Sequence, residues 1–178
     1  MRAPKAGRGL FAEARLRSLW GPLSALGLVF AVLVFGLDQA HKWWLLSVFG
    51  IEARQPVTLF PGFDMILVWN RGISYGWFSS HEAGARWLLI AVSLVVTAIL
   101  WRWLARTARP VTAAALGLII GGAIGNALDR LIHGAVADMF HFHVGDFSWY
   151  VFNLADVAIV AGVGLLLYES LAEGRHKT

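Results

Sequence analysis

The sequence contains no cysteine and few charged residues. Without cysteine, the chain can form neither disulfides nor thiolate metal sites, and it has no cysteine nucleophile. Charged residues are 15% of the 178 residues and hydrophobic residues are 58%, whereas an average soluble domain is roughly 25% charged. A soluble core could not bury so much apolar side chain. We therefore expect a single integral membrane domain over residues 1–178.

Charge is nearly absent from four long apolar stretches. A helix needs about 20 residues to cross the hydrocarbon core of a bilayer. The first stretch is too long for a cleaved signal peptide, and no A-x-A-like cleavage site follows it. The sequence therefore predicts four transmembrane helices, at about residues 18–37, 85–104, 110–130 and 149–169.

The segment between the first two predicted helices, residues 39–84, is long for a simple connection. It contains the runs VTLF and MILVW on either side of PGF, which predict two short strands about a turn. The expected fold is an all-α membrane protein with four transmembrane helices. A small exoplasmic β-containing cap lies between helices 1 and 2.

Basic residues are concentrated on one side of the predicted membrane. They precede the first span, separate the second from the third, and follow the fourth. The positive-inside rule places that side in the cytoplasm. Both termini are then cytoplasmic, and residues 1–17 form a basic cytoplasmic extension. No basic stripe accompanies a soluble domain, so we expect no nucleic-acid partner.

Polar residues gather at the predicted exoplasmic ends of the spans. Ionisable groups are costly in membranes and are usually functional there. The convergence of so many on one membrane face predicts a functional site at the exoplasmic surface. They are Asp38, Asn126, Asp129, Arg130, Asp138, Asn153 and Asp156.

Asp156 needs the strongest explanation, because it stands alone among apolar residues in the fourth span. An unpaired buried carboxylate would be strongly destabilising. A second carboxyl sharing one proton would turn that cost into acid–base chemistry. The sequence leaves four candidate partners. Asp138 is favoured by its apolar neighbours, but the choice stays open among Asp38, Asp129, Asp138 and Asp146.

The third span carries Gly117, Gly121 and Gly125 at four-residue intervals, with Gly122 as a further small position. This spacing puts three glycines on one helical face and predicts close helix packing. Asp129 follows near the end of the span. We expect it to have a structural or orienting role, with Arg130 or Arg71 as its ion-pair partner.

Five sequence blocks then occur in order: DQAHK at Asp38–Lys42, NRGISYG at Asn70–Gly76, GGAIGNALDR at Gly121–Arg130, VADMF at Val136–Phe140 and FNLAD at Phe152–Asp156. With these blocks the chain resembles the bacterial lipoprotein signal peptidase (signal peptidase II) family over nearly all of residues 20–170. The resemblance implies an aspartyl endopeptidase of the bacterial inner membrane. Such an enzyme cleaves prolipoproteins just before a diacylglyceryl-modified cysteine.

The resemblance also assigns residues. It makes Asp138 and Asp156 the catalytic pair. It gives substrate-binding or supporting roles to Asp38, Lys42, Asn70, Gly72, Asn126, Asp129, Arg130 and Asn153. It implies no cofactor and no metal, and it implies inhibition by a globomycin-type peptide. We expect a monomer.

The sequence departs from the family pattern at Met139 and Tyr150, where Phe and Pro are common, and at Tyr75, a position often Phe. These residues affect loop shape and substrate fit rather than the proposed pair. His141 and His143 could suggest a metal site, but two histidines without a third ligand are weak evidence for one.

Two other classes of protein can use intramembrane carboxylates. In a small transporter or channel subunit, they would relay protons or bind cations. In a scaffold protein, they would form structural pairs. The clustering at one face argues against a path across the membrane, and the two halves show no inverted repeat.

Overall fold

The computed structural model describes residues 19–72 and 82–175. Within them, four helices are long and apolar enough to cross a membrane: Ser24–Phe49, Gly84–Leu104, Pro110–His133 and Leu154–Ala172. A small four-stranded antiparallel sheet accompanies them. The predicted fold class of four membrane helices with a β-containing cap is confirmed. Residues 1–17 and the segment Ile73–Gly76 of the NRGISYG block lie outside the described residues.

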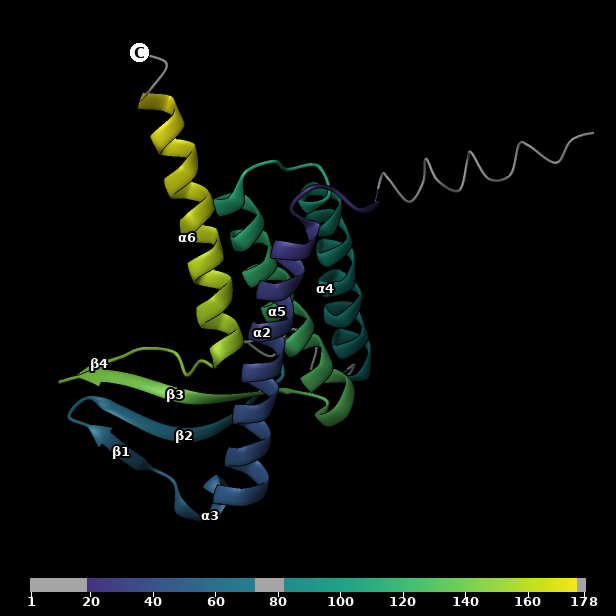
Figure 1. Ribbon diagram of the computed structural model, residues 1–178. Coiled ribbons are helices and arrows are strands. Elements are labelled where there is room, and N and C mark those ends of the chain that lie inside the picture. Colours follow the sequence, from purple (N-terminus) through teal and green to yellow (C-terminus); the bar gives the residue numbers. More distant parts are fainter. Residues whose placement is uncertain (1–18, 73–81, 176–178) are drawn as a thin grey trace, which may run out of the picture.

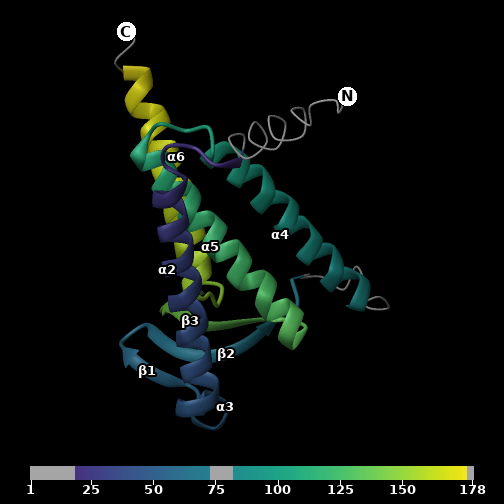
Figure 2. The ribbon, with the colours of Figure 1, turned by 45° about the vertical axis from the view of Figure 1, so that its right-hand side comes forward.

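Helix α5 (Pro110–His133) is the centre of the bundle and packs against α2 (Ser24–Trp43), α4 (Glu82–Leu104) and α6 (Leu154–Arg175) (Figures 1 and 2). Its apolar window is 61% buried, against 11% for the windows of α4 and α6. The outer helices expose large aliphatic side chains such as Val32, Ile99 and Val160. Such an outer surface suits lipid rather than water as its solvent.

Adjacent glycines let α5 pack closely on two sides. A Cβ added at Gly121 would lie 2.5 Å from the carbonyl oxygen of Ala31 in α2, and one added at Gly122 would lie 2.5 Å from that of Ala155 in α6. Both contacts are with backbone, which cannot move aside as a flexible side chain can. The glycines therefore bring α2 and α6 to the same level of α5.

Replacing Gly121 with alanine is expected to destabilise the bundle by about 3 kcal/mol, because the methyl group pushes α2 away from α5. Gly36→Ala is the matched control, since a Cβ there meets nothing within 4 Å. Thermal unfolding of both variants in one detergent measures the difference. Equal melting temperatures for the two variants would contradict this packing.

Helix α2 continues past the predicted end of the first span. It extends to Trp43, is prolonged by the π-helix η1 (Trp44–Phe49), and is followed by the short helix α3 (Ile51–Arg54). The prediction that Asp38 ends the helix was wrong. Lys42 lies one turn later and forms an ion pair with Asp38, so the charge is compensated inside the fold and the helix need not stop there.

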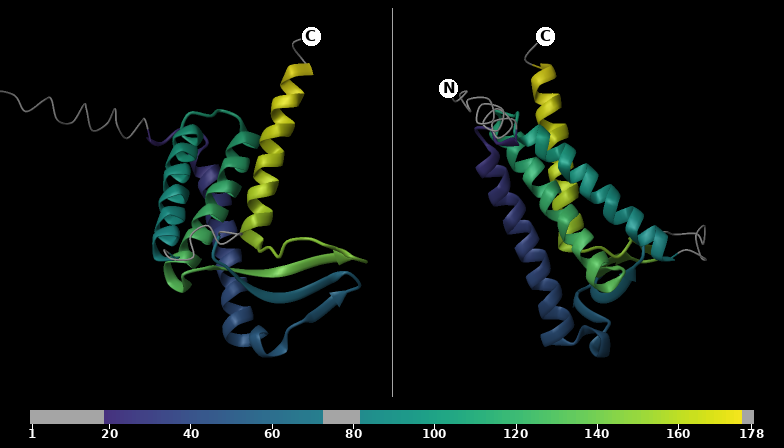
Figure 3. Two further views of the ribbon diagram at one scale, coloured as in Figure 1. Left: turned by 180° about the vertical axis from the view of Figure 1, so that it is seen from behind. Right: turned by 90° about the vertical axis from the view of Figure 1, so that its right-hand side faces the viewer.

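The sheet has the order β1 (Val57–Phe60), β2 (Phe63–Asn70), β3 (Val136–Val144) and β4 (Phe147–Ser148). It lies at the end of the bundle away from the C-terminus (Figures 1 and 3). Strands β1 and β2 are the two that the sequence predicts. No strand was predicted between the third and fourth helices, but this connection forms β3 and β4.

Helix α6 begins at Leu154, five residues later than the predicted fourth span. Residues 149–153 connect β4 to α6 instead, and Phe152 among them forms an isolated bridge with Phe140 of β3. Asn153 immediately precedes the helix. Its side-chain oxygen accepts a hydrogen bond from the backbone N–H of Asp156, so it is the N-cap rather than part of the first turn.

Candidate active site

Asp138 projects from the buried part of β3 and is only 2% exposed. Its two carboxyl oxygens accept hydrogen bonds from two amide side chains. Asn153 Nδ2 donates to Oδ1 at 2.7 Å, and Asn70 Nδ2 donates to Oδ2 at 2.9 Å. Asn70 is the last residue of β2, so the pairing of β2 with β3 brings this donor to the carboxyl.

A short turn fixes the direction of the Asn70 amide. The backbone N–H of Gly72 donates to Asn70 Oδ1 at 2.7 Å, and Gly72 has a φ of +84°. Glycine adopts this left-handed conformation without strain. With the amide oxygen held by Gly72, the Nδ2 group of Asn70 points to Asp138.

Asp156 lies in the first turn of α6 and forms a reciprocal cap with Asn153. The backbone N–H of Asn153 donates to Asp156 Oδ2 at 3.3 Å, while the backbone N–H of Asp156 donates to Asn153 Oδ1 at 3.0 Å. This is the geometry of a capping box. A negative charge in this position is also stabilised by the helix dipole.

Two asparagines join Asp138 and Asp156 into one cluster. Asn153 contacts both carboxyl groups. Asn126 of α5 donates to Asp156 Oδ1 at 2.8 Å and accepts a hydrogen bond from Asn153 Nδ2 at 3.2 Å. The helix α5, the strand β3 and the start of α6 therefore converge on a pair of carboxyls held by neutral donors.

Burial raises the pKa of Asp138 to about 6. This value is the net result, because the Asp156 carboxyl also raises the pKa, whereas the hydrogen bonds from Asn70 and Asn153 favour the ionised form and lower it. A carboxyl group in this range can hold a proton close to neutral pH. The arrangement can therefore supply one acid and one base at a single point.

A buried triad of charges lies directly behind the carboxyl pair. Lys42 Nζ is 2.8 Å from Asp38 Oδ2 and 2.7 Å from Asp129 Oδ2, and all three side chains are at most 4% exposed. The sequence analysis expected Arg130 or Arg71 as the ion-pair partner of Asp129, and the ion pair that the structure shows for Asp129 is with Lys42. The helical run of α2 beyond Asp38 brings Lys42 to Asp129.

Each carboxylate of the triad also holds one backbone amide next to the pair. Asp38 Oδ1 accepts from the N–H of Ala155 at 3.1 Å, and Asp129 Oδ2 accepts from the N–H of Ala137 at 3.2 Å. Ala155 precedes Asp156, and Ala137 precedes Asp138. The triad thus fixes the backbone that carries both carboxyl groups.

Gln39 also contacts both carboxylates of the triad, and it was not among the residues predicted from the sequence. Its Nε2 donates to Asp129 Oδ1 at 2.9 Å and lies 3.1 Å from Asp38 Oδ2. An uncharged amide gives no signal in a search for ionisable groups. Its place beside Asp38 in the DQAHK block was the available clue.

Arg130 lies at the border of the cluster, where its positive charge interacts with the charges of Asp138 and Asp156. Its Nη1 donates to the carbonyl oxygen of Asn126 at 3.3 Å. Its Nε is buried without a hydrogen-bond partner among the described residues. Asp146, by contrast, is exposed in the turn between β3 and β4 and lies outside the cluster.

The family model and the relatives found by sequence indicate the same family. The family model described as signal peptidase (SPase) II matches residues 30–172. The lipoprotein signal peptidase of Methylocella silvestris is 53% identical over 150 residues, which cover 84% of this chain and 88% of the relative. That of Beijerinckia indica is 55% identical over 145 residues, covering 82% and 87%.

Two solved structures share the fold. Both are described as bacterial membrane enzymes, and both are 22% identical to this chain. One has a TM-score of 0.73 and covers 86% of this chain and 92% of its own. The other has a TM-score of 0.71 and covers 83% and 93%. With the family model spanning most of the chain and relatives about half identical to it, the chain belongs to the signal peptidase II family.

Proposed function

We propose that this chain is a membrane aspartyl endopeptidase that removes signal peptides from diacylglyceryl-modified prolipoproteins, cleaving just before the lipidated cysteine. One observation carries the proposal: in a member of a peptidase family, Asp138 and Asp156 are bridged by Asn153 in a buried cluster. The curated relatives carry the name lipoprotein signal peptidase, which supports the choice of substrate.

The carboxyl pair activates water in this mechanism. Asp156, in the first turn of α6, starts ionised and takes a proton from the water as its oxygen attacks the scissile carbonyl carbon. Asp138, with its raised pKa, starts protonated and gives its proton to the carbonyl oxygen. In the second step Asp156 gives its proton to the amide nitrogen and Asp138 takes one back from a hydroxyl of the tetrahedral intermediate. The C–N bond then breaks, and the pair again holds one proton.

Neighbouring donors position the substrate. Arg130 and Asn70 lie beside the carboxyl pair, where their N–H groups can bind the backbone oxygens of the substrate. The strand β2 enters the site from the sheet, and its segment Phe63–Trp69 closes over the scissile bond. The signal helix arrives sideways from the bilayer, and the acyl chains of the substrate stay in lipid.

The orientation follows from charge. The α4–α5 connection, with Arg106 and Arg109, and the end of α6 lie at one end of the bundle, and the sheet lies at the other (Figure 1). The positive-inside rule then supports cytoplasmic termini and a carboxyl pair at the exoplasmic face of the inner membrane. The enzyme acts as a monomer and is inhibited by globomycin-type peptides.

The direct test uses the purified chain and a prolipoprotein precursor carrying diacylglycerol on its cysteine. We expect one cut, immediately before that cysteine, and inhibition of the cut by globomycin. The matched control is the same precursor without the lipid. Failure of the folded chain to cut the lipidated precursor, together with cation flux in proteoliposomes, would favour a transporter instead.

The pH dependence of cleavage should follow the protonation of Asp138. Since the proposed acid must be protonated, kcat/KM should fall as pH rises through the pKa of about 6. Asn70→Ala removes a hydrogen bond that lowers this pKa, so the fall should move to higher pH. The pH profiles of the two proteins, measured on one precursor, give the comparison. A shift to lower pH in the variant would be inconsistent with Asp138 as the acid.

A further inference from the structure

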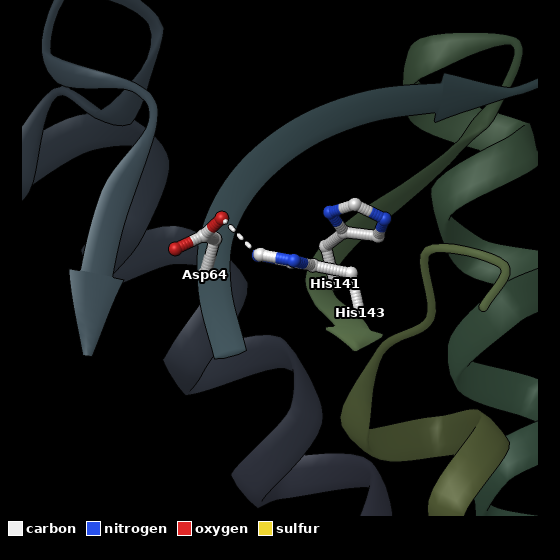
Figure 4. Close-up of side chains that lie close together, drawn as sticks. All are labelled: Asp64, His141 and His143. Carbon is white, nitrogen blue, oxygen red and sulfur yellow. Dashed lines mark hydrogen bonds and ion pairs between the residues drawn. The ribbon is translucent and has the colours of Figure 1, made fainter. Parts of the chain in front are cut away.

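A second cluster of metal-ligating side chains lies on the sheet. Asp64 of β2 and His141 and His143 of β3 each offer one ligand atom, and these atoms lie within 4.8 Å of one another. Figure 4 shows the two imidazoles rising from the same strand, with the carboxylate reaching them from its neighbour. The two histidines lie in β3, and Asp64 supplies the third ligand that the sequence did not reveal.

The regular geometry of the sheet creates the cluster. His141 and His143 are two residues apart, so they project from the same face of β3. Asp64 is the residue paired with His141 across the two antiparallel strands. Opposed side chains in such a pair have Cβ atoms about 5 Å apart, which is suitable for ligands of one ion.

The contact between His143 and Asp64 is close to the spacing of two ligands of one metal ion. His143 Nε2 lies 2.9 Å from Asp64 Oδ2. In a tetrahedral zinc site with ligand bonds of about 2.0–2.1 Å, two ligand atoms are about 3.3 Å apart. A small widening of this pair would therefore admit an ion in place of the shared proton.

Further side chains can orient the ligands. Ser148 Oγ lies 2.7 Å from His141 Nε2, and Thr58 hydrogen-bonds to Asp64. A ligating imidazole commonly gives its other N–H to an oxygen acceptor, which fixes the ring. If Nε2 of His141 donates to Ser148, then Nδ1 carries the lone pair that a metal needs.

We propose that Asp64, His141 and His143 form a binding site for one divalent transition-metal ion of the Zn²⁺ type. Two imidazoles and a carboxylate suit such an ion, with water in the remaining position. The ion would join β2 to β3. Those strands carry Asn70 and Asp138 at their other ends, but strand alternation puts His141 and Asp138 on opposite faces of β3. The site is therefore separate from the carboxyl pair.

The test measures binding of Zn²⁺ itself. The full chain, purified through a tag without histidine and treated with a chelator, is dialysed against a low micromolar concentration of the ion. We expect close to one equivalent in the wild type, and a melting temperature that rises with the ion. Asp64→Asn, His141→Ala and His143→Ala should each weaken binding by about tenfold or more.

Matched controls are Asp146→Asn, in an exposed turn of the same sheet, and His133→Ala, at the end of α5. Both should bind like the wild type. Co²⁺ gives a second readout, because tetrahedral coordination produces intense visible absorption that the His141→Ala/His143→Ala variant should lose. Equal binding by the wild type and this double variant would overturn the proposal and leave an ordinary Asp64–His143 ion pair. This result would not bear on cleavage by the carboxyl pair.

Discussion

Asp138→Asn and Asp156→Asn are each expected to lower kcat/KM for the lipidated precursor by about 10³-fold or more. Each substitution keeps the shape of the side chain but removes its ability to gain and lose a proton. General acid–base catalysis contributes roughly 10²–10⁴-fold in enzymes, and a pair that shares one proton loses both functions when either member is neutralised.

The double variant sharpens this prediction. If the two carboxyls act as one unit, Asp138→Asn/Asp156→Asn should be about as slow as either single variant, because catalytic groups that act together are not additive. Independent roles would instead multiply the two losses. Initial rates on one precursor, measured over the same range of substrate concentrations, distinguish the two cases.

Loss of folding must be separated from loss of chemistry. Asp146→Asn is the control for the substitution itself, since Asp146 is exposed outside the cluster. The melting temperatures of all variants in one detergent give the state of the fold. A folded Asp138→Asn or Asp156→Asn enzyme with activity within tenfold of the wild type would rule out the proposed pair.

The sequence was sufficient for Asp156 and insufficient for its partner. A carboxyl in an apolar span requires compensation, so Asp156 could be selected by elementary electrostatics. Asp138 could not be separated from Asp129 in this way, because both are acidic residues close to an apolar segment. The distinguishing fact is that Lys42 forms an ion pair with Asp129, and these residues are separated by about half of the chain.

Three features were misread, each for a different reason. A charge at Asp38 was taken as the end of a helix, but the compensating Lys42 keeps both residues inside it. Residues 149–153 were taken as helix, because a short apolar run does not distinguish strand or loop from helix. Asp64 was missed as a possible ligand because only the pairing of β2 with β3 brings it to His141. Of these errors, only the one at Asp64 concerns a contact between distant parts of the sequence, because Lys42 lies four residues from Asp38.

Lys42→Met is expected to lower the free energy of unfolding by about 3–5 kcal/mol. Removing one partner from a buried ion pair leaves an uncompensated charge, which is the costly case. Here the loss would leave both Asp38 and Asp129 without the cation that lies less than 3 Å from each. Methionine keeps much of the length and volume of the lysine, so the cost reports charge rather than a cavity.

Two further variants isolate the electrostatic origin of this loss. Arg102→Met removes an exposed cation elsewhere in the same bundle, and it should change stability by no more than about 0.5 kcal/mol. Adding Asp129→Asn to Lys42→Met removes one of the two orphaned charges, so the double variant should be more stable than Lys42→Met alone. A double variant less stable than Lys42→Met would contradict this account.

Lys42 should also affect cleavage without contacting the substrate, as a positioning residue. The carboxylates that it pairs with hold the amides of Ala137 and Ala155, each one residue before a member of the proposed pair. A displacement near 1 Å at a reacting group can cost about 10²-fold. At a temperature where Lys42→Met remains folded, we therefore expect kcat to fall by about that factor while KM changes little.

The fall of kcat/KM at high pH should also move in this variant, because the surroundings of Asp138 change. A purely structural role predicts instead that the folded fraction of the variant cleaves with the kcat and pH profile of the wild type, and active-site titration of that fraction would decide between the two.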